Sequence, residues 1–110
     1  MNGDIPERDW KKLKSIKDQA LETACERILE RVQSLIKSRD DGSHKTYLKL
    51  WRLMEDEDEQ ISLMFDDVKR STGLYKLGVW KLNGILSQKD FDDLSKETQQ
   101  RVKAFCDING

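Results

Sequence analysis

The side chains whose types and spacing come closest to acid–base chemistry lie in the segment Phe65-Asp66-Asp67-Val68-Lys69-Arg70-Ser71. On a helix, Asp66 and Asp67 stand four and three residues before Arg70, and side chains at these separations are neighbours. Paired carboxylates act as acid and base only when burial separates their pKa values, and consecutive helical residues point about 100° apart. The favoured interpretation is therefore a solvated face with ion pairs. Arg8 belongs to a second cluster of the same kind near the N-terminus.

Metal sites and other catalytic motifs find no support in the sequence. The chain has one His and two Cys that lie far apart, whereas zinc sites need clustered ligands of these types. An acidic run at residues 55–59 invites a calcium interpretation. Counted from Asp56, however, the sixth and twelfth residues are Ile61 and Asp67, where a calcium loop needs Gly and Glu. With no phosphate loop and no nucleophile elbow either, we expect no metal, no cofactor and no catalytic residue.

The charges are dense and almost balanced. Lys and Arg number 20 and Asp and Glu number 21, so the net charge is −1 at pH 7. No segment has the basic excess with which nucleic-acid binders neutralise phosphates, which disfavours nucleic acid as a partner. The contacts of a nucleic-acid-associated protein would have to come from Lys11, Lys12, Lys14 and Lys17. No apolar stretch is long enough for a membrane span or a signal peptide, which predicts a cytoplasmic protein.

Residues 6–38 carry the pattern of one long helix. Apolar side chains recur three or four residues apart at Trp10, Leu13, Leu21, Ala24, Ile28, Val32 and Leu35. Such a helix would be about 50 Å long, whereas the radius of gyration of a compact chain of this size is ~13 Å. The helix must therefore bend, project or be covered by a partner. Ser15 and Asp18 form a possible capping box, which leaves a break near Ser15 open.

The rest of the chain predicts shorter helices. After a loop at residues 39–43, a helix begins near His44 and breaks at about residues 55–57, where the acids would repel within one helix but suit the first turn of a new one. That next helix ends near residues 71–73. Residues 74–86 are apolar almost all round, which is typical of a central helix. Ser87 caps the last helical region, and a restart at Ser95 with Glu97 stays open. A buried stripe is expected at Tyr47, Leu48, Trp51 and Met54.

These elements predict one all-α domain, residues 1–110, built as an irregular bundle of four to six helices with a long N-terminal helix. Gly78 should let a neighbouring element approach the central helix closely. The side chains expected to be largely buried are Trp51, Phe65, Leu77, Trp80 and Leu82. Cys25 and Cys106 are expected to be buried free thiols.

A second apolar row on the first helix is the candidate interface. Cys25, Leu29 and Ile36 lie beside the main stripe, which makes the stripe wider than one neighbour within the chain would cover. Covering it with the same helix of a second chain predicts a two-fold homodimer. A bend near Ser15 would remove the need for that partner, so both arrangements stay open.

Three short motifs carry a resemblance to a known family. They are Ile5-Pro6-Glu7-Arg8-Asp9-Trp10-Lys11, then Phe65-Asp66-Asp67 with Lys69-Arg70-Ser71, and then Leu82 with Gly84-Ile85-Leu86-Ser87. Together they resemble a family of small uncharacterised bacterial helical proteins. The resemblance implies an all-helical, bacterial, cytoplasmic protein without a known activity, and it carries over no catalytic residue. Residues 82–94 are separately similar to short C-terminal helical modules that serve association.

Packing and solubility account for every feature found, so the sequence favours a small non-enzymatic protein-interaction module. Its partner would be another protein or a second copy of the chain, and no membrane is expected. Two alternatives stay open. One is a nucleic-acid-associated helical protein, and the other is an enzyme with a site around Asp66, Asp67 and Arg70.

Overall fold

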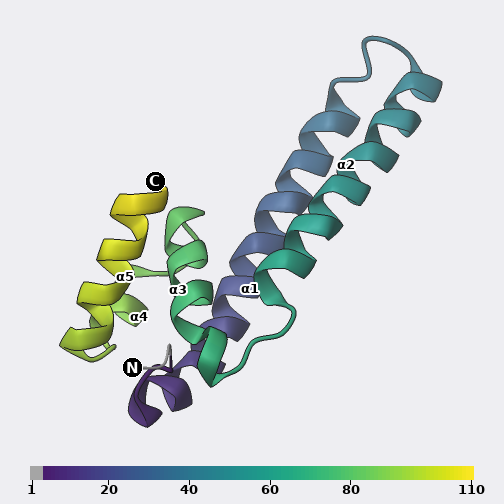
Figure 1. Cartoon of the computed structure of the whole chain (residues 1–110). Coiled ribbons are helices and arrows are strands. Elements are labelled where there is room, and N and C mark those ends of the chain that lie inside the picture. The colour runs from purple at the N-terminus through teal and green to yellow at the C-terminus, as the bar shows by residue number, and fades with distance from the viewer. Residues whose placement is uncertain (1–3) are drawn as a thin grey trace.

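The computed structural model describes residues 4–110, so the first three residues of the expected 1–110 domain lie outside it. Within that range the chain is all-α, without a strand, as the sequence predicts (Figure 1). Its elements are α1 (Glu7–Lys37), α2 (Ser43–Phe65), the 3₁₀ turn η1 (Arg70–Thr72), α3 (Gly73–Leu82), α4 (Gln88–Asp92) and α5 (Lys96–Asn109).

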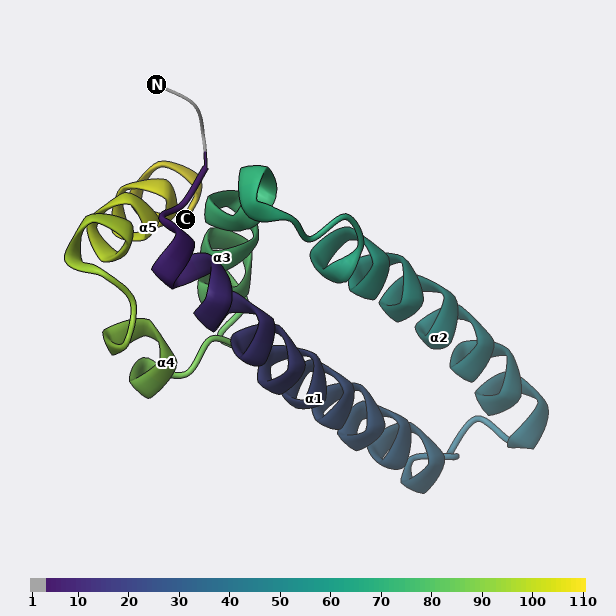
Figure 2. The ribbon, with the colours of Figure 1, turned by 90° about the horizontal axis from the view of Figure 1, so that it is seen from below.

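The α1–α2 hairpin dominates the shape of the molecule. The two helices lie antiparallel along each other, while α3, α4 and α5 gather at the end where α1 begins and α2 ends (Figures 1 and 2). The structure measures 55 × 25 × 24 Å and has a radius of gyration of 16.7 Å, compared with ~13 Å for a compact chain of about 100 residues. The outer half of the hairpin therefore projects away from the other helices.

Both long helices are continuous. α1 runs through Ser15, whose hydroxyl donates to the Lys12 carbonyl at 3.0 Å instead of capping a new helix. The predicted break of α2 at residues 55–57 is wrong, because α2 also runs unbroken through the acidic run. Like charges on an exposed helix face cost only a few tenths of a kcal/mol per pair. Arg31 of α1 further offsets the repulsion by pairing with Glu57.

The core forms where α3 packs on both α5 and the base of the hairpin. Phe65, Leu77 and Trp80 are buried as expected, and the rings of Phe65 and Trp80 stack with centroids 5.5 Å apart. The same expectation is wrong for Trp51 and Leu82, which are 56% and 40% exposed. Trp51 lies in the first half of α2. Figure 1 shows that this half of the helix projects beyond α3 and α5, which therefore do not cover it.

α2 ends at Phe65 rather than near residues 71–73, so that prediction is also wrong. Two side chains of α3 donate hydrogen bonds to carbonyls in the last turn of α2. The Lys76 ammonium donates to the Leu63 carbonyl at 2.9 Å, and the Trp80 indole N–H donates to the Met64 carbonyl at 3.0 Å. Carbonyls at a helix end have no partner within the helix, so these contacts satisfy them and place a positive charge at the negative end of the dipole.

α3 also touches α5 closely. A methyl group in place of the Gly78 hydrogen would overlap the Phe105 ring, which explains why the central helix carries a glycine there. The expected N-cap at Ser87 is confirmed, and of the two alternatives left open at Ser95 the structure shows the restart. The Ser87 hydroxyl accepts from the Asp90 N–H, and the Ser95 hydroxyl accepts from the Thr98 N–H.

Trp80→Ala should therefore destabilise the fold severely. The substitution removes a fully buried ring and an indole hydrogen bond, and changes of this kind cost about 3–5 kcal/mol. Urea unfolding at one low protein concentration measures the loss, with Trp51→Ala as the matched control at an exposed tryptophan. We expect the control to change the free energy of unfolding by about 0.5 kcal/mol or less. Equal losses in the two variants would contradict the placement of the core.

Candidate interaction surface

The structure gives no ion pair among the four residues of the expected polar cluster, Arg8, Asp66, Asp67 and Arg70. Residues 66–69 lie outside any helix, so the separations that would make helical neighbours of the two acids and Arg70 do not apply. Arg70 Nε donates to the Ile5 carbonyl at 2.7 Å, and Arg8 Nη2 donates to the Asp93 carbonyl at 3.3 Å. Both arginines therefore hold backbone segments in place.

The two aspartates of that segment shape the connection after α2. Asp66 is the exposed C-cap residue, with its N–H donating to the Ser62 carbonyl. Asp67 has a positive φ of 58° and forms an exposed ion pair with Lys69 at 3.3 Å. Neither carboxylate is buried. The burial that a pair of carboxylates needs for acid–base chemistry is therefore missing.

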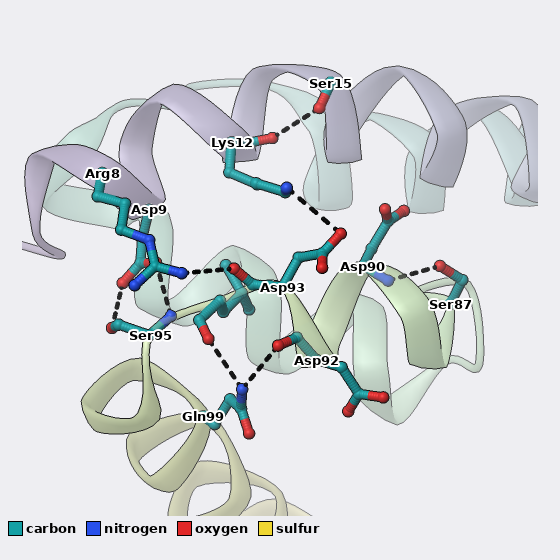
Figure 3. A network of polar contacts seen from close by, with 11 residues as sticks. Arg8, Asp9, Lys12, Ser15, Ser87, Asp90, Asp92, Asp93, Ser95 and Gln99 are labelled. Atoms are coloured by element: carbon teal, nitrogen blue, oxygen red, sulfur yellow. Dashed lines mark hydrogen bonds and ion pairs between the residues drawn. The ribbon is translucent and has the colours of Figure 1, made fainter.

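Among residues 4–110, the carboxylate that is fully buried belongs to Asp9, in the first turn of α1 (Figure 3). It accepts hydrogen bonds from the Ser95 N–H at 2.9 Å, from the Ser95 hydroxyl at 2.6 Å and from the Thr98 hydroxyl. These donors sit at the N-terminus of α5, where the helix dipole favours a negative charge. Asp9 thus joins the start of α1 to the start of α5.

Further side chains hold together the same corner of the molecule, where the start of α1 meets the start of α5. Lys12 of α1 pairs with the Asp93 carboxylate at 3.3 Å. The Gln99 amide donates to the carbonyls of Asp92 and Leu94 at 3.1 and 2.8 Å, which closes the turn between α4 and α5 (Figure 3). This corner positions the three C-terminal helices against the base of the hairpin.

The surroundings of Asp9 stabilise the ionised form of its carboxylate. Burial raises the pKa of the Asp9 carboxyl, but the hydrogen bonds from Ser95 and Thr98 outweigh burial and hold that pKa below its ordinary value. The carboxylate is therefore ionised at neutral pH, with both oxygens engaged. Within residues 4–110, no group of three or more His, Cys, Asp or Glu side chains could hold a metal ion.

An exposed apolar surface covers the projecting half of the hairpin, and we call it the hairpin patch. Its side chains are between 42% and 59% exposed, a range that is unusual for so many large apolar residues close together. The hairpin patch consists of Leu29 and Ile36 on α1 and Tyr47, Leu48, Trp51 and Met54 on α2. The four residues on α2 follow one another at helical spacing, so they form a continuous strip.

A shallow groove joins the two helices of the hairpin patch. Leu29 from α1 and Met54 from α2 both line it, together with the half-buried Cys25 and Ile61. Two acids, Glu57 and Asp58, border it. The α1 row expected as an interface, Cys25, Leu29 and Ile36, therefore continues onto α2.

Sequence reasoning missed the α2 side of this surface. Tyr47, Leu48, Trp51 and Met54 were expected as a buried stripe, and all four are exposed. The side of α2 that faces α1 carries the less exposed Thr46, Leu50 and Leu53 instead. The apolar spacing predicted a stripe that packs within the chain, and for these four residues that prediction is wrong. The spacing alone does not distinguish a surface that the same chain covers from a surface that stays uncovered.

The base of the hairpin is polar and fixed where it meets α3. Arg27 of α1 donates to the carbonyls of Asn83 and Gly84 at 2.8 and 2.7 Å, and so satisfies the C-terminal end of α3. Arg31 and Glu57 pair nearby. The Arg27 contacts join the hairpin to the end of α3, and the Arg31–Glu57 pair joins the two helices of the hairpin to each other.

Both cysteines are free and partly buried. The Cys106 Sγ lies 3.7 Å from the Gly78 carbonyl. Burial raises the pKa of the Cys106 thiol, more than the nearby Lys81 ammonium lowers it. A thiol with a raised pKa is a poor nucleophile, which favours a packing role for Cys106.

Comparisons with models of protein families, with curated proteins and with solved structures found no match to this chain. None of the helices within residues 4–110 is both long enough and apolar enough to cross a membrane.

Asp9→Asn should destabilise the protein at neutral pH and make its free energy of unfolding less dependent on pH in the acid range. Because the pKa of Asp9 is lowered in the folded state, its contribution is present above the unfolded-state pKa and is lost as the pH falls through the folded-state pKa. The free energy of unfolding of the wild type should therefore fall between about pH 5 and pH 2 more steeply than that of D9N. At pH 7 the substitution should cost about 2 kcal/mol.

Denaturant unfolding at several pH values measures both effects. Asp93→Asn is the matched control, because Asp93 makes an exposed ion pair at the same corner, and such pairs contribute at most about 1 kcal/mol. A D9N protein with the stability and pH slope of the wild type would show that the buried carboxylate does not hold α1 to α5.

Proposed function

We propose that the protein is a non-enzymatic protein-interaction module that binds through the hairpin patch. The observation that carries the proposal is the exposure of Trp51, Tyr47 and four aliphatic side chains on one projecting element. Aromatic side chains and Met are enriched at the centres of protein interfaces, where they bury much area with few flexible bonds.

The extent of the hairpin patch supports this function. Large apolar side chains each present on the order of 100–250 Å² when fully exposed, so six that are about half exposed offer on the order of 500 Å². A standard interface takes about 800 Å² from each partner. The hairpin patch and its polar rim are therefore large enough for specific binding.

The two alternatives have less support from the described residues. An enzyme site at Asp66, Asp67 and Arg70 would need a buried or mutually oriented group. All three residues are exposed, and Arg70 and Asp67 have other partners, the Ile5 carbonyl and Lys69. Nucleic-acid binding would use the four lysines at positions 11, 12, 14 and 17, and two of them already have partners within the chain. Lys12 pairs with Asp93, and the Lys14 ammonium lies 5.4 Å from the centre of the Trp10 ring. The bacterial origin and cytoplasmic location implied by the resemblance stay predictions.

Photo-crosslinking in the cells that make the protein tests the function. A photoreactive phenylalanine analogue replaces Trp51 in the full chain, and the control chain carries it at Glu97, an exposed position on α5 at the opposite end of the molecule. We expect a discrete protein adduct from position 51 and none from position 97. Because Trp51 is exposed, the replacement should leave the fold intact.

Adducts of equal yield and pattern from both positions would contradict the proposal, and so would none from position 51. The mass of the adduct identifies its partner class, since two linked copies of this chain have twice the 12.9 kDa of one chain.

A further inference from the structure

We infer that the hairpin patch binds an amphipathic helix of another protein, with basic side chains beside the apolar face of that helix. The inference rests on the proposed function and names the chemistry of the partner. Three observations carry it. The groove of the patch lies between two helices, the charges beside the groove are acidic, and the chain already places a helix of this chemistry against the hairpin.

The groove between α1 and α2 favours a helix as its occupant. Its walls are side chains of two helices, and the backbone N–H and C=O groups of a helix are paired within that helix. The groove therefore offers no backbone partner to a strand or a loop, whereas a helix that enters it pairs its own backbone groups. From Tyr47 to Asp58, α2 rises about 17 Å, which is the length of a helix of about 12 residues.

The charged side chains of α2 beside the groove are acidic. Glu55 stands four residues after Trp51, and Asp58 stands four residues after Met54, so both acids continue the apolar strip towards the base of the hairpin. Asp58 also lines the groove. Both acids are exposed, and among residues 4–110 neither has an ion pair. Their carboxylates are therefore available to basic side chains of a partner.

α1 also carries acids beside the patch. Glu26 stands three residues before Leu29, and Glu22 stands three residues before Cys25. Both acids are exposed, and the part of the chain that the structure describes gives them no ion pair. Carboxylates from both helices therefore lie beside the patch.

The basic residues in the outer half of α2 lie on another side of the helix. At about 100° per residue, they are about 140–180° around α2 from Met54, which lines the groove. Lys45 and Arg52 stand three and four residues from Leu48, at the edge of the patch that is directed away from α1, and the third basic residue is Lys49. The groove side of the patch therefore attracts basic side chains, and the opposite edge does not.

The chain itself places one helix of this chemistry against the hairpin. α3 is largely apolar, carries Lys76 and Lys81, and has no acid. It packs against both α1 and α2 at the base of the hairpin. The Lys76 ammonium donates to the Leu63 carbonyl, at the negative end of the α2 dipole. α3 leaves the hairpin patch uncovered, so a partner helix of similar chemistry has room to bind there.

Three synthetic peptides of about 18 residues test the inference on the full chain. Two of them have leucines three and four residues apart, which form one apolar face, with Lys beside that face in one peptide and Glu in the other. The third has the composition of the Lys peptide, with its leucines scattered around the helix. Fluorescence anisotropy measures the dissociation constant of each labelled peptide.

At low salt, we expect the amphipathic Lys peptide to bind at least about tenfold more tightly than either of the other two. Its advantage over the Glu peptide should largely disappear at about 1 M salt, where the screening length is only about 3 Å. Its advantage over the scattered peptide should remain, because that advantage comes from the apolar face.

Charge reversal locates the site. Asp58→Lys should weaken binding of the Lys peptide at least about fivefold, because Asp58 lines the groove. Asp56→Lys is the matched control, at an exposed position about 140° around the same helix from Trp51. It should keep the dissociation constant within about twofold of the wild-type value. Circular dichroism confirms that both variants are folded.

Equal binding of the Lys and Glu peptides, or binding of neither, would overturn the inference, and so would equal effects of the two substitutions. Crosslinking from position 51 then separates this failure from that of the proposed function. A discrete adduct shows that the interaction function stands with a partner of other chemistry, a second copy of this chain included. If position 51 gives no adduct, the function fails as well.

Discussion

The structure depends on a mismatch in length between the hairpin and the helices that cover it. α1 has 31 residues and is about 46 Å long, whereas α3 and α5 have 10 and 14 residues and measure about 15 and 21 Å. The shorter helices can therefore cover only the base of the hairpin. The last buried side chain of α1 is Ile28. Beyond it the molecule is two helices thick, and a pair of helices with apolar residues on several sides must expose some of them.

Polar side chains that satisfy the ends of other helices hold the covered half together. Asp9 of α1 accepts from the start of α5, Lys76 and Trp80 of α3 donate to the end of α2, and Arg27 of α1 donates to the carbonyls after α3. Unpaired groups at helix ends are costly to bury. Each contact removes that cost and also fixes the position of one helix against another.

Local signals in the sequence predicted much of the fold. The cap at Ser87, the close approach at Gly78 and the central position of Trp80 all depend on a few neighbouring residues and came out as expected. The end of α2 was predicted wrongly, because it depends on contacts with Lys76 and Trp80 of the following helix. Local acid repulsion was also overestimated, so a break was predicted where α2 is continuous.

The candidate surface was only half predictable. The row with Leu29 on α1 was recognised as wider than the chain would cover, but the row with Trp51 on α2 was taken for core because apolar spacing looks the same in both cases. Asp9 resembled an ordinary acid in the first turn of a helix. Its burial depends on Ser95 and Thr98, more than 80 residues away. Such long-range contacts leave no trace in a local pattern.

The outer hairpin exposes large apolar side chains on both of its helices, among them Leu29 and Trp51. Under the proposed function, another protein surface covers them.

Hydrogen exchange of the full chain, measured by mass spectrometry in dilute protein, tests this most directly. The amides of residues 29–37 and 43–54 should exchange much faster than those of α3, because no other helix covers the outer hairpin. Exchange in the outer hairpin that is as slow as in α3 even in dilute protein would contradict the account, because the hairpin would then need no partner to cover it.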